Sequence, residues 1–413
     1  MIIAWLLALL VVSNPKAAKA APVSPPGRDI RVGTDVKTIR EAIKLAQPGD
    51  TIHLQPIVYH DTAIFQAKKG EPGRPITLDG HGATLEEADA LDLAKWKEVA
   101  PGLFANSELL PPRELNDAAI MRWFFLWDGK MNHMGRTSKG IKAPFKKAGD
   151  LQPGEWTFVR DQAREQPGAS QICGTFYVKL PPGQKLAEAN IAAPMRLNGV
   201  QLGGDNAHLI IKNITATHPY NDGFNIHGDC RDVVFKNIRA LECGDDGISS
   251  HESAEVSVDG LVSIGNSTGI TDILLAHTSY NHVFIADCHA FDLFFMNNGS
   301  YKVENTVVLS SSEHPLMVSS SKGEHAELTL DNIFILRAGR PVPVLVQKGT
   351  KLTATRVTLE NATLTALGEV NYKNCLINGQ LMPAGSLAAG ADHVKLIKEL
   401  VPAEYQKRFT QVK

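Results

Sequence analysis

Carboxylate and imidazole side chains recur at a regular spacing in the middle of the chain. The segment Asp222-Gly-Phe-Asn-Ile-His227 is followed by three related segments, which run from Asp246 to His251, from Asp272 to His277 and from Asp292 to Asn297. Their first aspartates lie 24, 26 and 20 residues apart. A repeat of this length is typical of one coil of a solenoid. Because stacked parallel strands lie about 4.8 Å apart, equivalent residues of successive coils are expected to meet.

Clustered carboxyl groups and imidazoles suit the hydrolysis of glycosidic bonds. One carboxyl acts as an acid and a second as a base or nucleophile, about 5–5.5 Å apart for retention and about 6.5–9.5 Å apart for inversion. Crowding keeps one carboxyl of such a cluster protonated, as an acid catalyst requires. Asp245 adds a further carboxylate beside Asp246. We therefore predict that the catalytic residues are Asp222, Asp245 and Asp246, with His251 and His277 as orienting or proton-handling partners.

Strand alternation places the neighbouring side chains. Phe224 and Ile226 are expected to point inward, with Asn225 and His227 outward. The same pattern puts Ile248 and Ser250 inward in the next coil, and Leu274 and Ala276 inward in the third. The three histidines then share one solvent face, and further substrate contacts are expected from His227, Asp272, Asn297, Tyr220 and Asn225. Aspartates at solenoid turns can also simply cap backbone groups.

The flanking segments read as parts of the same solenoid. Apolar spacing predicts a helix over Thr38–Gln47 that covers the open end, within an N-terminal cap and first coils at 28–85. The period is lost over 86–190, which we interpret as an irregular β insertion. It carries four tryptophans that either pack the insertion or stack on sugars: Trp96, Trp123, Trp127 and Trp156. The main solenoid is predicted at 191–384, and a C-terminal cap helix at 385–413.

Composition limits the partners and the compartment. The charges nearly cancel, with 42 Lys and Arg against 44 Asp and Glu, so nucleic acid is not expected as a partner. Residues 1–20 hold an apolar run followed by Ala18-Lys-Ala20, which predicts a signal peptide, with 21–27 as a linker. The apolar run is too short to span a bilayer. We expect a secreted or periplasmic monomer that acts on a polysaccharide, with a short membrane anchor as the alternative for the N-terminal segment.

The five cysteines give no sign of a disulfide framework or a zinc site. They are scattered, and their number is odd. A bridge between Cys230 and Cys243 is one interpretation. The other is that the cysteines pack in the coils as small hydrophobic residues.

Two sets of residues resemble known families. The block Thr38–Leu85 resembles the start of many right-handed parallel β-helix proteins of the pectin-lyase-like superfamily. The segments Asn221-Asp-Gly-Phe224 and Gly244-Asp-Asp-Gly-Ile248 are similar to the Asn-Thr-Asp-Gly and Asp-Asp-Cys-Ile motifs of polygalacturonases. This resemblance implies an all-β fold and inverting hydrolysis by Asp222, Asp245 and Asp246.

The chain also departs from the polygalacturonase pattern. The positions of that family's Gly-His-Gly and Arg-x-Lys hold Gly269–Asp272 and Phe294–Asn297 instead. The cation that would bind a uronate is missing there, which argues against galacturonan as the substrate. His251 or His277 takes the role of the family histidine in this interpretation.

Three other functions remain open from the sequence. A polysaccharide lyase could use a histidine with Tyr220 or Tyr280 as the base, and the aspartates could then hold calcium. A transition-metal site ranks lower, because three histidines in a straight column span about 9.6 Å. A non-catalytic carbohydrate-binding β-helix would not need acids and imidazoles at outward positions. We therefore predict a glycoside hydrolase that requires no cofactor, with calcium reserved for the lyase.

Overall fold

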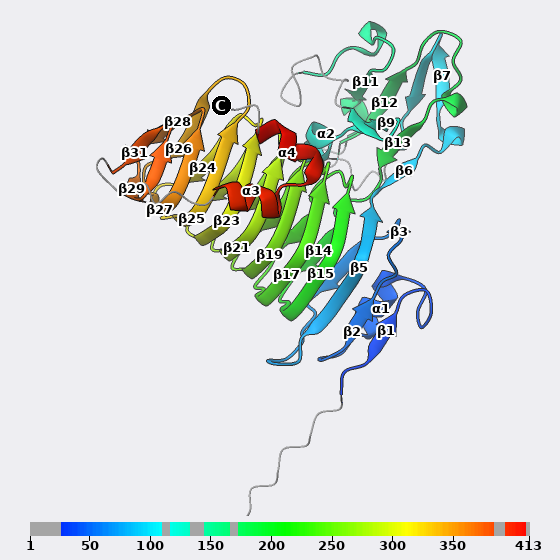
Figure 1. Ribbon diagram of the computed structural model, residues 1–413. Helices are drawn as coiled ribbons and strands as arrows, with labels where there is room; N and C mark the ends of the chain where they lie inside the picture. The colour runs from blue at the N-terminus through cyan, green and yellow to red at the C-terminus, as the bar shows by residue number, and fades with distance from the viewer. Residues whose placement is uncertain (1–25, 110–115, 133–143, 166–171, 384–392, 410–413) are drawn as a thin grey trace, which may run out of the picture.

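The computed structural model describes residues 26–109, 116–132, 144–165, 172–383 and 393–409. Within them the chain winds into a long parallel β-solenoid, with a small β insertion at one side (Figure 1). The predicted signal peptide and all but the end of the predicted linker lie outside the described residues. None of the described helices is long and apolar enough to cross a bilayer.

The first of two stacked sheets carries the long strands of the coils. Its path through the described residues runs through β1 (Asp29–Arg31), β2 (Thr51–His53), β5 (Ile76–Glu86), β15 (Ala207–Thr217), β17 (Arg231–Leu241), β19 (Glu255–Ile264), β21 (His277–Ala286), β23 (Ser300–Ser310), β25 (Glu327–Arg337), β27 (Lys351–Glu360), β30 (Cys375–Ile377) and β31 (Gln380–Met382). Two further strands pair beside this path, β3 (Val58–Tyr59) and β29 (Glu369–Lys373). Neighbours along the path are parallel except β30 and β31, which form an antiparallel end.

The second sheet carries the short strands and the aspartates. Its order is β4 (Ala63–Gln66), β14 (Val200–Gly203), β16 (Phe224–Ile226), β18 (Asp246–Ser250), β20 (Thr268–Asp272), β22 (Phe291–Met296), β24 (His314–Ser319), β26 (Val342–Val346) and β28 (Ala362–Ala366). Alternate side chains enter one continuous core between the sheets, among them Phe224, Ile226 and Ile248. The inward positions predicted for these three residues are confirmed.

A column of glycines lies at the start of the short strands, just before or within their first residues, and brings successive coils close together. Gly199, Gly223, Gly247 and Gly269 occupy equivalent positions, and a Cβ on any of them would lie within 2.5–2.8 Å of the carbonyl oxygen of the next coil. Only glycine fits such a close backbone approach. The residues immediately before these glycines are therefore held against each other from coil to coil.

The long strands bend at a row of residues with positive φ. This row includes Asn213, Asn237, Asn305 and Asn332. Several of their amides donate hydrogen bonds to the preceding coil, as where Asn305 donates to Asn281 and Asn332 donates to Asn305, both at 2.7 Å. Asparagine tolerates the left-handed conformation better than most residues, so this row turns each long strand without a loop.

The segment predicted as an insertion, 86–190, forms two small antiparallel sheets together with residues 191–194, which were predicted to start the main solenoid. One contains β6 (Ala88–Ala90), β9 (Phe125–Trp127), β10 (Lys130–Asn132) and β13 (Ile191–Pro194), and the other β7 (Lys97–Ala100), β8 (Leu103–Asn106), β11 (Trp156–Arg160) and β12 (Gly174–Lys179). Trp96, Trp123 and Trp156 are buried in the core of the insertion, and Trp127 packs against that core. The packing interpretation of these tryptophans therefore holds for the structure.

The N-terminal helix lies where the sequence placed it. Helix α1 (Ile39–Leu45) starts at the N-cap Thr38 in a capping box with Glu41. Its buried residues Ile39, Ala42 and Ile43 join the solenoid core and cover its N-terminal end. A polar N-cap followed three residues later by Glu is a known start signal, which explains why this helix was predictable.

The C-terminal helices are present but do not cap the solenoid. Helices α3 (His393–Leu400) and α4 (Ala403–Phe409) pack on the outer face of the first sheet, against residues such as Phe284, Val307 and Leu336 (Figure 1). The predicted helix is thus confirmed, whereas its predicted position over the end is wrong. The outer face of β21, β23 and β25 carries the apolar residues against which the apolar side of these helices packs.

Four of the five cysteines are buried as hydrophobic residues, and all five are free thiols. Cys230, Cys243 and Cys288 lie in the solenoid core with Cys375, and Cys173 is partly exposed. The interpretation of Cys230 and Cys243 as a bridge is wrong. Cys230 precedes β17 (Arg231–Leu241) and Cys243 follows it, so the two thiols lie at opposite ends of one strand.

Candidate active site

The structure brings three aspartates together at the turns that enter β16 and β18. Asp222 precedes Gly223 of the glycine column, while Asp245 and Asp246 precede Gly247 in the next coil. Each offers one carboxylate oxygen to a group in which all three oxygens lie within 4.8 Å of one another. This cluster, Asp222, Asp245 and Asp246, is called the aspartate cluster below.

Asp222 is held by a full set of donors. Its Oδ2 accepts hydrogen bonds from Asn225 Nδ2 at 2.6 Å and from Ser249 Oγ at 2.7 Å, and its Oδ1 accepts one from the backbone N–H of Asp246 at 3.1 Å. Asn198 makes the same backbone contact one coil earlier, where its Oδ1 accepts a hydrogen bond from the backbone N–H of Asp222. Asp222 therefore caps the following coil, as the alternative interpretation of the sequence allowed, and also lies in the cluster.

Asp245 is paired with a cation from the insertion. Helix α2 (Asp117–Arg122) ends at Arg122, whose Nη2 lies 2.7 Å from Asp245 Oδ2. The same guanidinium donates to Asn221 Oδ1 at 2.6 Å. Burial and the neighbouring Asp222 raise the pKa of Asp245 to about 7, and Arg122 opposes that rise. Asp245 can therefore change its charge near neutral pH.

Asp246 is the carboxyl that most strongly favours the protonated form. Burial raises its pKa well above the usual value, and the charges of Asp245 and Asp222 add to the rise. Arg122 and Thr271 oppose it only in part. A carboxyl that keeps its proton beside one that can lose it is the pairing expected of an acid and a base.

Two histidines form a stack near the far end of the same strands. The rings of His227 and His251 lie 4.1 Å apart and are inclined by 15°. His251 Nε2 lies 3.2 Å from Ser249 Oγ, whose single proton goes to Asp222. The imidazole must therefore donate to the hydroxyl, which links His251 to Asp222 through Ser249. Burial and the neighbouring His227 lower the pKa of His251.

The expectation of an open flank holds only in part. Asp222 and Asp246 are 2% and 7% exposed, and the Asp245 side chain is 16% exposed. The His227 side chain is 43% exposed and pairs with Glu252 at 3.1 Å. Solvent therefore reaches the cluster at Asp245 and Arg122 and reaches the histidine stack, while the other two carboxyls are enclosed.

The prediction that His277 shares this face is wrong. His277 starts β21 in the first sheet, where it pairs with Glu255 and Ser300. The residue of the third coil that aligns with Asp246 is Thr268, and Gly269-Ile270 aligns with Gly247-Ile248. The sequence alignment on Asp272 was thus displaced by four residues, which also explains why Leu274, predicted inward, is 38% exposed.

Asp272 lies in the core instead of a substrate subsite. It is 0% exposed and accepts hydrogen bonds from Thr278 Oγ1 at 2.6 Å and from Tyr280 Oη at 3.0 Å. Burial raises its pKa to about 6. Tyr280 is not an accessible base for a lyase, because its hydroxyl donates to Asp272 and its ring is buried.

Two further predicted contacts lie away from the aspartate cluster. Tyr220 is 2% exposed, and its ring packs 5.8 Å from that of Trp123 in the core of the insertion. Asn297 follows β22, where its side chain accepts from the backbone of Leu274 and donates to Glu324. Neither side chain is positioned to bind a substrate at the cluster. Asn225, in contrast, contacts Asp222 directly.

Three residues of the site were missed in the sequence. Arg122 lies in the insertion, where no repeat marks it. Ser249 could have been found, because it aligns with Asn225 on the outward side of β18. Asn198 precedes Gly199 as Asp222 precedes Gly223, so the glycine column is the signal that would have given both its position and the register of the third coil.

The aspartate cluster has the composition of a cation site. Hard divalent cations such as Ca²⁺ prefer several carboxylate oxygens. Two features argue against a resident ion: Arg122 already supplies a positive charge to Asp245, and Asp222 uses its oxygens to accept three hydrogen bonds. The residues present therefore fit a protonated acid better than a calcium site.

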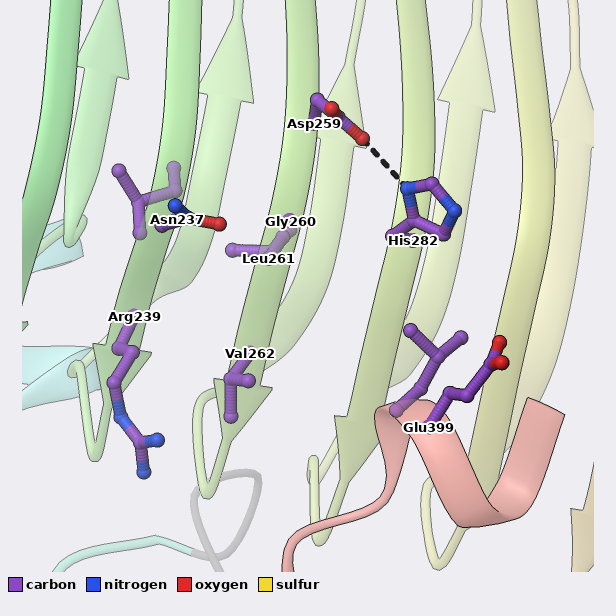
Figure 2. Close-up of a pocket in the computed structure, with 10 residues that line it drawn as sticks. Asn237, Arg239, Asp259, Gly260, Leu261, Val262, His282 and Glu399 are labelled. Atoms are coloured by element: carbon purple, nitrogen blue, oxygen red, sulfur yellow. Dashed lines mark hydrogen bonds and ion pairs between the residues drawn. The ribbon is translucent and has the colours of Figure 1, made fainter. Parts of the chain in front are cut away.

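A surface hollow elsewhere does not belong to this site. It lies on the outer side of the first sheet beside α3, where Asn237, Gly260, His282 and Glu399 line it (Figure 2). His282 pairs with Asp259 at 2.7 Å. Asn237, Gly260 and His282 belong to the bend of the long strands, on the sheet opposite the aspartate cluster, and Glu399 belongs to α3.

Comparison with known proteins gives structural neighbours only. No protein-family model and no curated protein matches the chain. The solved structure of XylC with xylose matches with a TM-score of 0.51 at 12% identity, over 83% of this chain and 70% of that one. A glycoside hydrolase matches with a TM-score of 0.48 at 10% identity over 92% and 100%, and the pectate lyase Pel9A with 0.42 at 10% over 90% and 84%.

The chain is a right-handed parallel β-helix. The predicted fold class is thereby confirmed, together with the predicted likeness to β-helix proteins. At these identities the likeness establishes the β-helix fold alone, so the function depends on the site.

Proposed function

We propose that this β-helix is an enzyme that cleaves glycosidic bonds of a polysaccharide, as a glycoside hydrolase. The observation that carries the proposal is the aspartate cluster, in which carboxylate oxygens lie within 4.8 Å and one carboxyl strongly favours its protonated form. Asp246 is the general acid and protonates the leaving oxygen of the glycosidic bond. Asp245 is the base or nucleophile on the other side of the anomeric carbon.

Charge balance supports these roles. Arg122 favours the ionised form of Asp245, while the two neighbouring carboxyls favour the protonated form of Asp246. Asp222 accepts hydrogen bonds from three donors and so presents a carboxylate that can stabilise the positive charge developing on the sugar ring. The link from Asp222 through Ser249 to His251 fixes the Asp222 carboxylate in one orientation.

The stereochemical course separates two versions of this mechanism. The resemblance to polygalacturonases implies inversion, whereas the closeness of the carboxylate oxygens is nearer to the spacing typical of retention. The anomeric configuration of the first product, observed by NMR, assigns Asp245 as the base that activates water or as the nucleophile.

The substrate and the compartment are part of the proposal. XylC was solved with xylose, which makes neutral xylose-containing glycans a reasonable first set to test beside acidic ones. The apolar segment and Ala18-Lys-Ala20 support export to the periplasm or the medium, and the protein is proposed to act as a monomer.

A calcium-assisted polysaccharide lyase is the second candidate. The observation that favours it is the same group of three carboxylate oxygens, which could hold Ca²⁺ if Asp246 lost its proton. Elimination leaves an unsaturated sugar that absorbs ultraviolet light, whereas hydrolysis adds the mass of water. A gain in absorbance that EDTA abolishes would select the lyase.

The first prediction tests Asp246 as the acid. Asp246→Asn is expected to lower kcat by about 10²–10⁴-fold, because the amide cannot donate the catalytic proton. Its melting temperature should stay close to that of the parent, since the amide resembles the protonated carboxyl that this burial favours. Reducing-end release and thermal unfolding measure the two effects.

The matched control for this test is Asp259→Asn. Asp259 lies on the first sheet, where it pairs with His282 at the surface. This variant should keep full activity. Full activity of Asp246→Asn, or a large fall in its melting temperature, would assign Asp246 to the structure of the turn.

A further inference from the structure

Aromatic side chains gather on the outward side of the second sheet, two coils beyond the aspartate cluster. The rings of Phe291 and Phe294 lie 4.6 Å apart at an angle of 13°, and His314 stacks on Phe291 at 5.4 Å and 24°. Phe291, Phe294 and His314 are called the aromatic platform below. All three are only partly buried, whereas Leu293 and Phe295 of the same strand fill the core.

The strand register connects the platform to the candidate catalytic residues. Asp246 of β18 pairs with Thr268 of β20, which pairs with Phe291 of β22 and then with His314 of β24. A parallel row connects Ser249 through Thr271 to Phe294. Both rows cross the strands at right angles, so the platform lies about 9.6 Å from the site, which is two strand spacings.

We propose that the aromatic platform is a subsite that stacks on a sugar ring of the same glycan chain whose bond is cleaved at the aspartate cluster. The inference rests on the proposed function and adds the direction of the substrate, which crosses the strands of the second sheet from β18 toward β24. It also assigns the substrate a length of several sugars, because a disaccharide at the cluster does not reach β22.

The occupant follows from the chemistry of the row. A pyranose ring has an apolar face and a polar rim, and flat aromatic side chains bind such faces while polar neighbours bind the rim. The polar end of the row is formed by Asp246, and its apolar end by Phe291 and Phe294, with Met317 beside them in register with Phe294. A glycan chain matches both ends at once, whereas an apolar protein partner would match only one.

Packing of the three rings on each other explains only part of why aromatic residues occupy these positions. The two phenyl rings and His314 do pack on each other, which accounts for the buried part of each ring. The core does not require rings at these positions, because Leu293 and Phe295 of the same strand fill it. Outward positions one and two coils earlier are indeed polar, namely Thr268 and Thr271 of β20 and Asp246 and Ser249 of β18.

The test measures how affinity depends on chain length. Asp246→Asn serves as the parent to prevent cleavage, and calorimetry measures binding of xylohexaose, cellohexaose and hexagalacturonate with the matching disaccharides. Phe294→Ala in this parent should lower the ratio of hexasaccharide to disaccharide affinity by about tenfold, as expected when roughly half of a phenyl ring loses its contact. Phe294→Tyr should keep the ratio, because it keeps the ring.

A matched aromatic deletion separates this effect from a loss of stability. Phe334 is partly buried on the first sheet, where its ring stacks on His393 at 4.7 Å. Phe334→Ala should leave the affinity ratio unchanged. Equal loss in both alanine variants would show a general effect on the fold and would overturn the subsite.

The remaining outcomes distinguish the subsite from the function on which it rests. If the parent prefers hexasaccharides and Phe294→Ala keeps that preference, the subsite is overturned while the hydrolase stands. A parent that binds hexasaccharides no better than disaccharides also overturns the subsite. If the parent binds none of the probes and the unmodified protein cleaves none, both proposals fail together.

Discussion

Arg122 controls the charge balance of the aspartate cluster although it comes from outside the solenoid. It lies 2.7 Å from Asp245 and, among the described residues, is the cation that opposes the rise in the pKa of both Asp245 and Asp246. An enclosed carboxyl keeps its proton unless a cation compensates the loss of water. The insertion therefore decides which carboxyl of the cluster is ionised.

Replacing Arg122 should move the pH dependence of activity. In Arg122→Gln the pKa of Asp245 is expected to rise above about 7, since the group that lowers it is gone. The acidic limb of the kcat/KM profile should shift to higher pH by about 1 unit. Arg160→Gln is the control, because Arg160 pairs with Glu165 on the insertion. An unmoved limb would contradict the role of Arg122.

A second carboxyl makes stability depend on pH without touching the site. Asp292 is 0% exposed and burial raises its pKa to about 7, while hydrogen bonds such as that from Ser312 at 2.6 Å oppose the rise. Its native pKa exceeds the unfolded value, so the folded state binds the extra proton between about pH 4 and 7. Stability from this group is present at low pH and is lost as pH rises through about 7.

Asp292→Asn should remove that dependence. Between pH 5 and pH 8 the unmodified protein is expected to lose on the order of 3 kcal/mol of unfolding free energy through this group, and the variant should lose correspondingly less. Urea unfolding at the two pH values measures the difference. If the unfolding free energy changes equally between the two pH values in both proteins, the Asp292 carboxyl ionises freely in the core.

Residue types and spacing predicted the aspartate cluster. Other residues of the candidate site were missed, and several predicted residues lie elsewhere. Asp222, Asp245 and Asp246 were predictable because glycines fix the same step in both coils. Asp272 and His277 matched the repeat by type but not by register, since a buried aspartate with hydroxyl donors looks in the sequence like an exposed one. Arg122 could not be predicted, because its approach depends on how the insertion folds back.

At the scale of the elements, the bend of the long strands is the most testable feature. Asn305 has a φ of 43°, donates to Asn281 and accepts from Asn332. Asn305→Ala should cost about 2–3 kcal/mol of unfolding free energy, from two hydrogen bonds and a left-handed backbone that alanine disfavours. Asn305→Gly should cost less, because glycine keeps the backbone.

The control for the bend is a surface asparagine. Asn371 is exposed and donates only to Glu369 two residues away in β29. Asn371→Ala should change the unfolding free energy by less than about 0.5 kcal/mol. Equal effects at positions 305 and 371 would show that the asparagine row does not stabilise the bend.

Element type was predictable wherever the pattern was local. The capping box of α1 and the alternation of Phe224 and Ile226 need no knowledge of the rest of the fold. The position of α3 and α4 was not predictable, because helical spacing shows that one face of a helix is apolar but not which surface that face covers. The β character of the insertion was predicted, whereas the pairing of its strands into two four-stranded sheets was not.

For the whole molecule, the helices α3 and α4 act as a cover for one side of the β-helix. They bury Phe284, Val307 and Leu336 of the first sheet, and Arg408 of α4 pairs with Asp287 at 2.9 Å. A chain that ends at Pro383 should therefore expose an apolar surface, bind a hydrophobic dye and aggregate at lower temperature. Its activity before aggregation should persist, because the aspartate cluster lies on the other sheet.

Reversing the charge of Arg408 disturbs the packing of α4 less than removing both helices does. Arg408→Glu should loosen α4 through repulsion from Asp287 while the apolar contacts remain. Dye binding between that of the full chain and that of the truncated chain is expected. No change in either variant would mean that the helices contribute nothing to the stability of the sheet.

The glycine column also bears on how such a molecule can grow. The coils after Gly269 stack without a glycine at this position, where Asp292 stands in β22, so whole turns can be duplicated downstream of the acids without disturbing their mutual distances. Lineages could thus lengthen the track available to a polymer while its cutting point stays untouched, so product size and bond specificity can evolve separately.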